Sequence, residues 1–162
     1  MLKKSVLFKV MGSTEMGLGH VNRCLTLVRA LPENWCATLM VNNDPLVIKY
    51  LENIDLTFET GLGVKLLLES KTSLFKYPVD VLIFDQLEQN TPLLKYLKDQ
   101  FNCLTLALDY FDYKSNDVNI IVNLFNQVDQ VASCDGAVKC YEGLEFAIIS
   151  QKFAAYKNKN NQ

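Results

Sequence analysis

The feature that most constrains the fold of this chain is a series of short apolar runs separated by segments with helical spacing. The runs that read as buried strands span residues 5–10, 37–41, 79–84 and 104–108. Between the first two, intervals of three and four residues separate the apolar residues Cys24, Leu27, Val28 and Leu31. Continuous apolar strands that alternate with helices are typical of a parallel sheet covered on both faces. We therefore predict a Rossmann-like α/β fold, with a mostly parallel sheet and helices on both faces.

Turn-forming and capping residues predict where the other elements begin and end. Pro32 ends the first helix, and Asn43 or Asp44 caps a second helix with Pro45 in its first turn. A third helix begins at Thr91. Further predicted elements are strands over 55–60, 119–122 and 145–149 and a short helix over 64–70. Together they predict one domain over residues 1–151, followed by a polar tail over 152–162.

Composition excludes several classes of partner. Hydrophobic residues make up 49% of the 162 residues and charged residues 21%, which is typical of a globular domain. The formal net charge of −2 provides no polybasic face, so nucleic acid and anionic membranes are poor candidate partners. No window approaches the roughly 20 apolar residues of a membrane helix, so we expect no membrane insertion.

The cysteines and the amino-terminal segment predict a cytoplasmic protein. The first residues form no signal peptide, because Lys9 interrupts the short apolar stretch. The five cysteines contain no C-x-x-C pair, and reduced thiols are their expected state. Cys134 and Cys140 could meet across a loop, but a single histidine argues against a zinc site. We expect neither a metal nor a cofactor.

The turn after the first strand, residues 12–20, is the predicted ligand-binding feature. Ligands of open α/β sheets bind beyond the carboxyl ends of the strands, often at this turn. Gly17 and Gly19 allow a tight bend and a close approach of a ligand. The following helix directs its free N–H groups at the same place. The spacing matches neither the dinucleotide-binding G-x-G-x-x-G fingerprint nor a P-loop.

His20, the only histidine, ends this turn. At a helix N-terminus a second positive charge is disfavoured, so a neutral imidazole that accepts a proton from water or a sugar hydroxyl is expected. A plain helix-capping role is an equal alternative. Arg23, one turn further, either holds a phosphate or carboxylate or ties down Asp85. Ser13 and Thr14 either donate hydrogen bonds to a phosphate or hexose hydroxyl or cap the helix region.

Two aspartates follow predicted strands. Asp85 and Asp109 should face the same sheet edge as His20, because the carboxyl ends of parallel strands gather there. Asp85 either orients His20 or Arg23 or caps its own turn. The aromatic and acidic segment 109–113 either stacks on a sugar ring or packs on its own domain.

These residues carry a resemblance to a known family. The block Gly17-x-Gly19-His20-Val21-x-Arg23-Cys24-Leu25-x-Leu27 resembles the N-terminal segment of the UDP-sugar hydrolases of pseudaminic acid biosynthesis. It is also similar to spore-coat polysaccharide glycosyltransferase-like proteins, and both groups are similar to GT-B glycosyltransferases. Supporting segments follow in the family's order, at 81–85, 106–109, 117–123 and 143–149, so the resemblance spans nearly the whole chain.

The resemblance implies nucleotide-sugar processing in surface-glycan biosynthesis, on a UDP-sugar or sugar acceptor, by a hydrolase or a transferase. His20 would be the base that activates water, with Gly17, Gly19 and Arg23 shaping the sugar and phosphate site. The chain corresponds to the N-terminal half of a GT-B fold, so we expect the UDP-binding domain to come from a separate polypeptide. Self-association into a homodimer is the other partnership that we expect.

Three segments depart from the family pattern. Gln86 and Leu87 stand where the hydrolases have His-Tyr, whose tyrosine is implicated in catalysis, and Ser150 replaces an arginine. The segment 9–11 replaces the family's Arg-x-Asp. The alternative hypothesis is therefore a non-catalytic sugar-binding or partner-docking module, or a remnant of a truncated enzyme.

Overall fold

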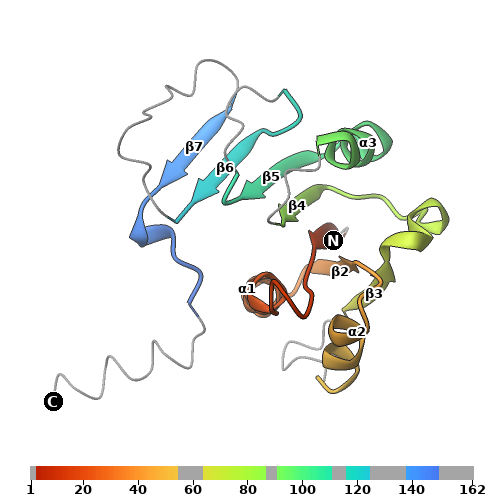
Figure 1. The fold of residues 1–162 in the computed structure, drawn as a ribbon. Helices are drawn as coiled ribbons and strands as arrows, with labels where there is room; N and C mark the ends of the chain where they lie inside the picture. Colours follow the sequence, from red (N-terminus) through yellow and green to blue (C-terminus); the bar gives the residue numbers. More distant parts are fainter. Residues whose placement is uncertain (1–2, 55–63, 87–90, 111–115, 125–137, 150–162) are drawn as a thin grey trace, which may run out of the picture.

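The computed structural model describes residues 3–54, 64–86, 91–110, 116–124 and 138–149, and its core is a seven-stranded parallel sheet (Figure 1). The strand order is β3-β2-β1-β4-β5-β6-β7. The strands are β1 (Lys4–Val10), β2 (Trp35–Val41), β3 (Lys65–Leu68), β4 (Val81–Asp85), β5 (Leu104–Leu108), β6 (Ile120–Asn123) and β7 (Lys139–Glu142). The helices are α1 (Gly19–Arg29), α2 (Pro45–Glu52) and α3 (Thr91–Phe101), with 3-10 helices η1 (Glu69–Leu74) and η2 (Leu144–Phe146). The predicted Rossmann-like α/β fold is confirmed.

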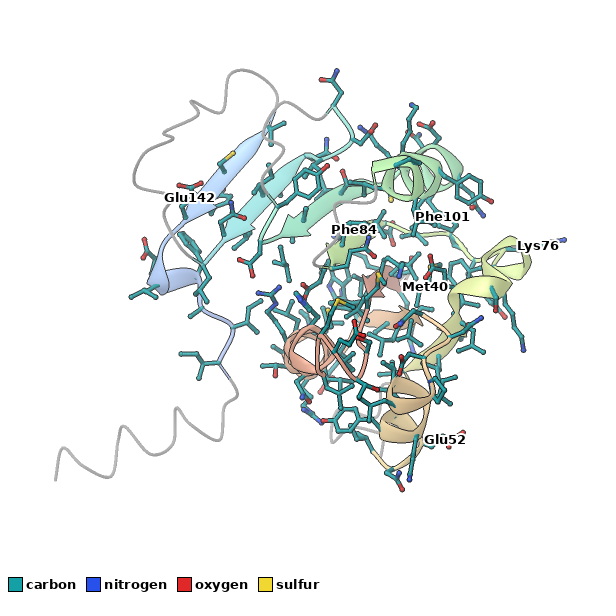
Figure 2. The ribbon with its side chains drawn as sticks, viewed as in Figure 1. Met40, Glu52, Lys76, Phe84, Phe101 and Glu142 are labelled. Carbon is teal, nitrogen blue, oxygen red and sulfur yellow. The ribbon has the colours of Figure 1, made fainter. Side chains whose placement is uncertain are left out.

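Each face of the sheet carries its own apolar cluster. Alternate residues of a strand point to opposite faces, so Phe8 packs with α1 and α2 whereas Leu7 packs on the other side. The cluster around Leu7 includes Met40 and Phe84, which are labelled in Figure 2, and Leu94 and Leu97 of α3. Figure 1 shows α1 and α2 on one side of the sheet and α3 on the other. Both clusters consist mainly of fully buried side chains, which explains why the strands read as continuous apolar runs.

Local signals account for the helix boundaries. The side chain of Asp44 accepts a hydrogen bond from the backbone N–H of Leu46 at 2.8 Å, and Pro45 occupies the first turn of α2. Helix α1 begins at Gly19, with Leu18 as its N-cap residue and no side-chain cap, and the preceding Gly17 has a φ of +75° that favours glycine. The N-terminus of α1 therefore remains available to a ligand.

Two predicted elements are wrong. The expected helix over 64–70 is instead strand β3 followed by η1, because residues 65–68 pair with β2 in parallel register. The expected strand over 145–149 is instead η2 and an irregular segment, and the last described strand is β7. Short apolar runs fit either helix or strand by periodicity alone, so the available pairing partner decided both cases.

Several sequence predictions lie outside the described residues. They are the strand over 55–60, Leu87, the aromatic residues 111 and 113, Cys134, Ser150 and the tail over 152–162. Among the described residues, Cys24, Cys36 and Cys103 are free thiols, whereas Cys140 is disulfide-bonded. The expectation of reduced cysteines is therefore wrong at Cys140. None of the helices in the described ranges has the length and apolarity needed to cross a bilayer.

The strand order positions the predicted site. The chain runs outward from β1 to β3 and then returns to place β4 on the other side of β1. The crevice between β1 and β4 is the topological switch point at which ligands of this fold bind. In the parallel register Val10 pairs with Asp85, so the turn after β1 and the end of β4 lie next to each other.

Candidate functional site

The turn between β1 and α1 is closed by its own hydrogen bonds. The backbone N–H of Gly17 donates to the carbonyl of Ser13 at 2.7 Å, and the hydroxyl of Ser13 accepts from the backbone N–H of Met16 at 3.0 Å. A side chain at Gly12 would crowd its surroundings, because an added Cβ would lie 3.0 Å from a methyl of Val47. The side chain of Asn42 holds both backbone groups of Gly12. The start of α1 is therefore rigidly positioned.

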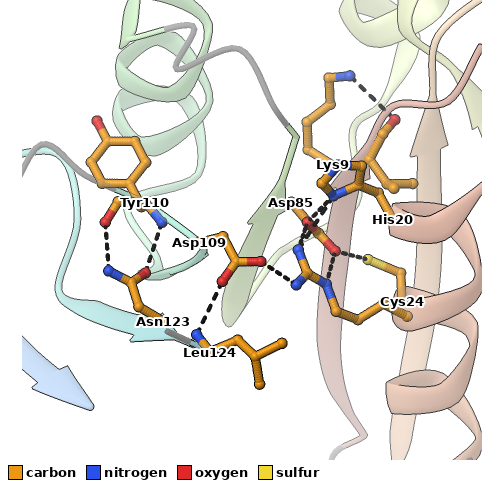
Figure 3. Close-up of polar contacts among 10 residues, drawn as sticks. Lys9, His20, Cys24, Asp85, Asp109, Tyr110, Asn123 and Leu124 are labelled. Carbon is orange, nitrogen blue, oxygen red and sulfur yellow. Dashed lines mark hydrogen bonds and ion pairs between the residues drawn. The ribbon is translucent and has the colours of Figure 1, made fainter. Parts of the chain in front are cut away.

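His20 and Asp85 form the centre of the site (Figure 3). The His20 Nδ1 atom lies 2.7 Å from Asp85 Oδ1, and Asp85 is fully buried at the end of β4. Arg23 binds both oxygens of the same carboxylate, with Nε 2.9 Å from Oδ2 and Nη2 on Oδ1. The thiol of Cys24 contacts Oδ2 at 3.5 Å. One helix, α1, thus supplies every described side-chain partner of this carboxylate.

The charge on Asp85 decides the tautomer of His20. Burial by itself would raise the pKa of Asp85, but hydrogen bonds from His20 and Arg23 and the Arg23 charge hold it below its usual range. Asp85 is therefore an ionised acceptor, and Nδ1 of His20 must carry the hydrogen that it donates. The 3.3 Å approach of Arg23 Nη2 to Nδ1 is then a contact between two donors. Nε2 of a neutral ring remains as the proton acceptor.

Arg23 links this pair to the next strand. Its Nη1 atom donates to Asp109 Oδ2, and Asp109 Oδ1 accepts from the backbone N–H of Leu124 at 3.1 Å (Figure 3). Burial lowers the pKa of Arg23, but its hydrogen bonds and charge interactions with Asp85 and Asp109 outweigh burial and raise it. The guanidinium is therefore always charged and connects α1, β4 and β5.

The end of β5 is a constrained stretch of backbone. Asp109 adopts a left-handed φ of +49°, which a non-glycine residue rarely does. Asn123 binds the next residue from both sides: its Oδ1 accepts from the N–H of Tyr110 at 2.9 Å, and its Nδ2 donates to the Tyr110 carbonyl at 3.1 Å. Strain of this kind persists where the surroundings enforce it, which is common at functional sites.

A cavity of about 460 Å³ opens over His20. The residues that line it are Met16, Gly19, His20, Asn22, Arg23, Thr26 and Ile148. A neighbouring cavity of about 200 Å³ includes Asp109 and shares Arg23 and Ile148 with the first. The volume of the larger cavity lies within the roughly 300–1,000 Å³ of ordinary ligand pockets.

The structure brings together four of the predicted site residues. His20, Arg23, Asp85 and Asp109 form one connected network, and Gly19 lines the cavity with His20. Gly17, Ser13 and Thr14 do not line it. The hydroxyl of Ser13 accepts from backbone N–H groups within the turn, and the alternative that Ser13 or Thr14 caps the helix is wrong, because α1 has no side-chain cap. Their roles as ligand contacts remain predictions.

Sequence reasoning missed part of the cavity wall. Asn22 and Thr26 lie three and seven residues after Gly19, so helical spacing could have identified them. Ile148 comes from the far end of the chain, and no local pattern indicates its position.

The arrangement provides an imidazole held by a buried carboxylate beside an open cavity. Within the described ranges, no group of three His, Cys, Asp or Glu side chains could hold a metal ion. No protein-family model matches this chain, and no curated protein matches its sequence.

Proposed function

We propose that this domain is the base-bearing wall of a sugar-nucleotide-processing enzyme of surface-glycan biosynthesis, a UDP-sugar hydrolase or glycosyltransferase of GT-B type. The observation that carries the proposal is the His20–Asp85 pair, joined at 2.7 Å, on the wall of a 460 Å³ cavity at the switch point of the sheet. The resemblance of residues 17–27 to the hydrolase family supports the same assignment.

In the proposed reaction, Nε2 of His20 removes a proton from the attacking oxygen. For a hydrolase this oxygen belongs to water, and for a transferase it belongs to a sugar hydroxyl. The oxygen forms a bond to the anomeric carbon, the bond from that carbon to the phosphate oxygen breaks, and UDP leaves with the electron pair. Asp85 stabilises the imidazolium that forms and keeps the ring in the reactive tautomer.

The charge balance of the site favours a positioning role for Arg23. Its guanidinium already faces two carboxylates, those of Asp85 and Asp109, so its charge is largely compensated. A diphosphate would instead depend on the N-terminus of α1, which has no side-chain cap, and on the separate UDP-binding domain.

The direct test is UDP release from a UDP-sugar by this chain combined with a UDP-binding polypeptide. We expect His20→Ala to lower the rate by about 10²–10⁴-fold, the usual contribution of a general base. Lys95→Met is the matched control, because Lys95 is exposed on α3 and forms an ion pair with the equally exposed Asp99, away from the cavity over His20. Equal rates for wild type and His20→Ala would remove the base assignment.

A second test needs no partner domain. The ¹⁵N resonances of the His20 ring should show the hydrogen on Nδ1 in the wild type at neutral pH. In Asp85→Asn the carboxylate acceptor is lost, and the amide can donate to Nδ1, so the hydrogen should move to Nε2. An unchanged tautomer in this variant would contradict the proposed orienting role of Asp85.

A second candidate function is a non-catalytic sugar-binding or partner-docking module. Exposed apolar side chains favour it: Leu144 is 72% and Ile149 62% exposed, and Phe146 and Ile149 line the smaller cavity beside Arg23. Calorimetry that detects UDP-sugar binding without turnover would support this candidate. Light scattering should then show self-association that Leu144→Lys abolishes, and a wild-type monomer would count against the docking role.

A further inference from the structure

A third cavity lies at the opposite, amino-terminal edge of the sheet. It has a volume of about 200 Å³ and is lined by Lys3, Ser5, Val6, Cys36, Ala37, Thr38, Lys65, Phe75, Tyr77, Pro78 and Val79. The connection from β3 to β4 carries only the short 3-10 helix η1, in yellow-green in Figure 1, where a crossover helix would ordinarily cover the sheet. The cavity is thus a consequence of this short connection.

The floor of the cavity presents polar groups from adjacent strands. In the sheet register Ser5 pairs with Cys36, and Thr38 pairs with Lys65. Residues 36 and 38 lie on the same face of β2 because side chains alternate along a strand. Residues Met40 and Leu67, each two positions further along, belong to the cluster on the α3 face. The polar side chains and the apolar core therefore share one side of the sheet.

Thr38 is the group in this cavity whose hydrogen-bonding capacity is unused. Its side chain lines the cavity and is only 8% exposed, and within the described ranges its hydroxyl makes no hydrogen bond. The neighbouring hydroxyl of Ser5, by contrast, donates to the carbonyl of Pro78 at 2.6 Å and lies 3.2 Å from Asp80 Oδ2. A hydroxyl that lines a cavity and has no partner among the described residues can donate to or accept from a ligand atom.

The walls combine aromatic rings with positive charge. Phe75 and Tyr77 pack edge to face with ring centroids 5.6 Å apart, and Lys65 Nζ lies 3.8 Å from the centroid of Tyr77. Lys3 and Lys65 are both exposed, and they are the formally charged side chains among the described lining residues. No carboxylate of the described residues lines this cavity, and Asp80, which accepts from the lining residue Ser5, offsets only one of the two lysine charges. The net electrostatic preference is therefore for an anion.

The volume limits the ligand to one ring. An apolar cavity of about 150 Å³ holds benzene, whereas drug-sized ligands occupy about 300 Å³ or more. A cavity of about 200 Å³ leaves room for a six-membered ring and one small polar group. The aromatic wall suits a flat ring. A carboxylate on that ring could accept from Thr38 and Lys65 together, because these two residues are neighbours across β2 and β3.

We propose that this amino-edge cavity binds a small aromatic carboxylate, with the ring against Phe75 and Tyr77 and the carboxylate on Thr38, Lys65 and Lys3. The site lies at the sheet edge opposite His20 and does not depend on the proposed function. Cys36 lines the cavity as a free thiol.

Benzoate is the probe, and benzamide and benzylamine are the matched neutral and cationic controls with the same ring. We expect benzoate to cause saturable shifts in the backbone amide resonances of Cys36, Thr38 and Lys65. Benzamide should bind more weakly and benzylamine most weakly, because both lysines repel a cation. Absence of saturable shifts with benzoate, or tighter binding of benzylamine, would overturn the proposal.

Three variants locate the interaction. Thr38→Val should weaken benzoate binding about two- to tenfold through loss of one hydrogen bond. The variant should remain folded, because valine has nearly the same shape and the Thr38 hydroxyl makes no hydrogen bond within the described ranges. Lys65→Met should weaken binding about two- to fivefold, whereas Lys95→Met, on α3, should not change it. Equal affinities in Lys65→Met and Lys95→Met would contradict the assigned site.

Discussion

Two fully buried charges occupy neighbouring strands at the same sheet edge, and they are stabilised very differently. Asp85 ends β4 and Lys9 is the penultimate residue of β1, where it pairs in register with Phe84. Asp85 faces α1, and Lys9 lies on the opposite face of the sheet. Asp85 accepts hydrogen bonds from His20 and from two nitrogens of Arg23. Figure 3 shows both residues in one view.

Lys9 has weaker compensation. Its Nζ atom lies 3.2 Å from Glu69 Oε2 and 3.4 Å from the carbonyl of Val10, and the Glu69 side chain is about a third exposed. Burial lowers the pKa of Lys9 although Glu69 opposes the shift, so its charged form is disfavoured. The pKa of Asp85 is also lowered, but for an acid this means that the charged form is favoured. Both side chains are fully buried, so the difference between them comes from the number of polar partners. Asp85 has enough partners to favour its charged form, whereas Lys9 does not.

The largest expected effect is on Asp85. Asp85→Asn keeps the shape of the side chain but removes the charge, so Arg23 and His20 lose their buried acceptor. We expect the free energy of unfolding to fall by about 3 kcal/mol, as for other broken buried ion pairs. Urea denaturation with an unchanged m-value measures it. A loss of less than about 1 kcal/mol would mean that the cluster is not the electrostatic centre described above.

Lys9→Met should change stability far less. Methionine occupies a similar volume and needs no charge partner, and Glu69 can be solvated because it is partly exposed. We expect unfolding free energies within about 1 kcal/mol of wild type, since apolar replacement of a buried ion pair is often neutral or stabilising. The same urea titration tests this expectation. A loss as large as that of Asp85→Asn would break the contrast between the two sites.

The free energy of unfolding should differ in its pH dependence between wild type and each variant, in acid for Asp85→Asn and at alkaline pH for Lys9→Met. The pKa of Asp85 is below its ordinary 3.8, so its stabilisation is present above that value and is lost as the pH falls through the lowered pKa. The pKa of Lys9 in the folded protein is below its ordinary 10.5. At pH values between the lowered pKa and 10.5, the unfolded chain binds more protons than the folded protein, so the free energy of unfolding rises with pH.

The measurement is unfolding free energy against pH for wild type and both variants. The gap between wild type and Asp85→Asn should close in acid. The gap between wild type and Lys9→Met should shift in favour of the wild type as the pH rises towards 10.5. A parallel set of curves across the whole range would show that neither group titrates as described.

The smallest expected effect concerns thiol reactivity. Burial raises the pKa of Cys24 well above its ordinary value, and the adjacent Asp85 charge adds to the shift. In the native protein we expect iodoacetamide to modify the partly exposed Cys36 at least about tenfold faster than Cys24. Peptide mapping by mass spectrometry gives both rates. Rapid native modification of Cys24 would indicate that the α1–β4 contact opens readily.

Much of the site followed from the sequence, because strand ends in a parallel sheet meet at one edge. That rule alone predicted that His20, Asp85 and Asp109 lie together, and the structure confirms their proximity. The rule could not decide which alternative Arg23 adopts. The ion pairs of Arg23 with Asp85 and Asp109 depend on how far β4 and β5 extend alongside α1. Local sequence patterns do not encode this relative position.

Two other features could not be predicted from the sequence, because they depend on contacts between distant segments. Lys9 read as an interruption of an apolar run, yet it is fully buried, because Glu69 from a distant segment reaches it. Residues 65–68 read as helix and became β3 once β2 offered a parallel partner.

By itself, the sequence determined the alternation of strands and helices, the rigid glycine turn before α1 and the chemical groups at the carboxyl edge of the sheet. Only the tertiary structure decided the protonated nitrogen of His20, the contribution of Ile148 to the cavity and the uncovered pocket beside Thr38. The physical reason is the sequence separation over which each interaction acts. Periodicity and caps act within a few residues, whereas hydrogen-bond partners, burial and cavities arise between segments that are far apart in the chain.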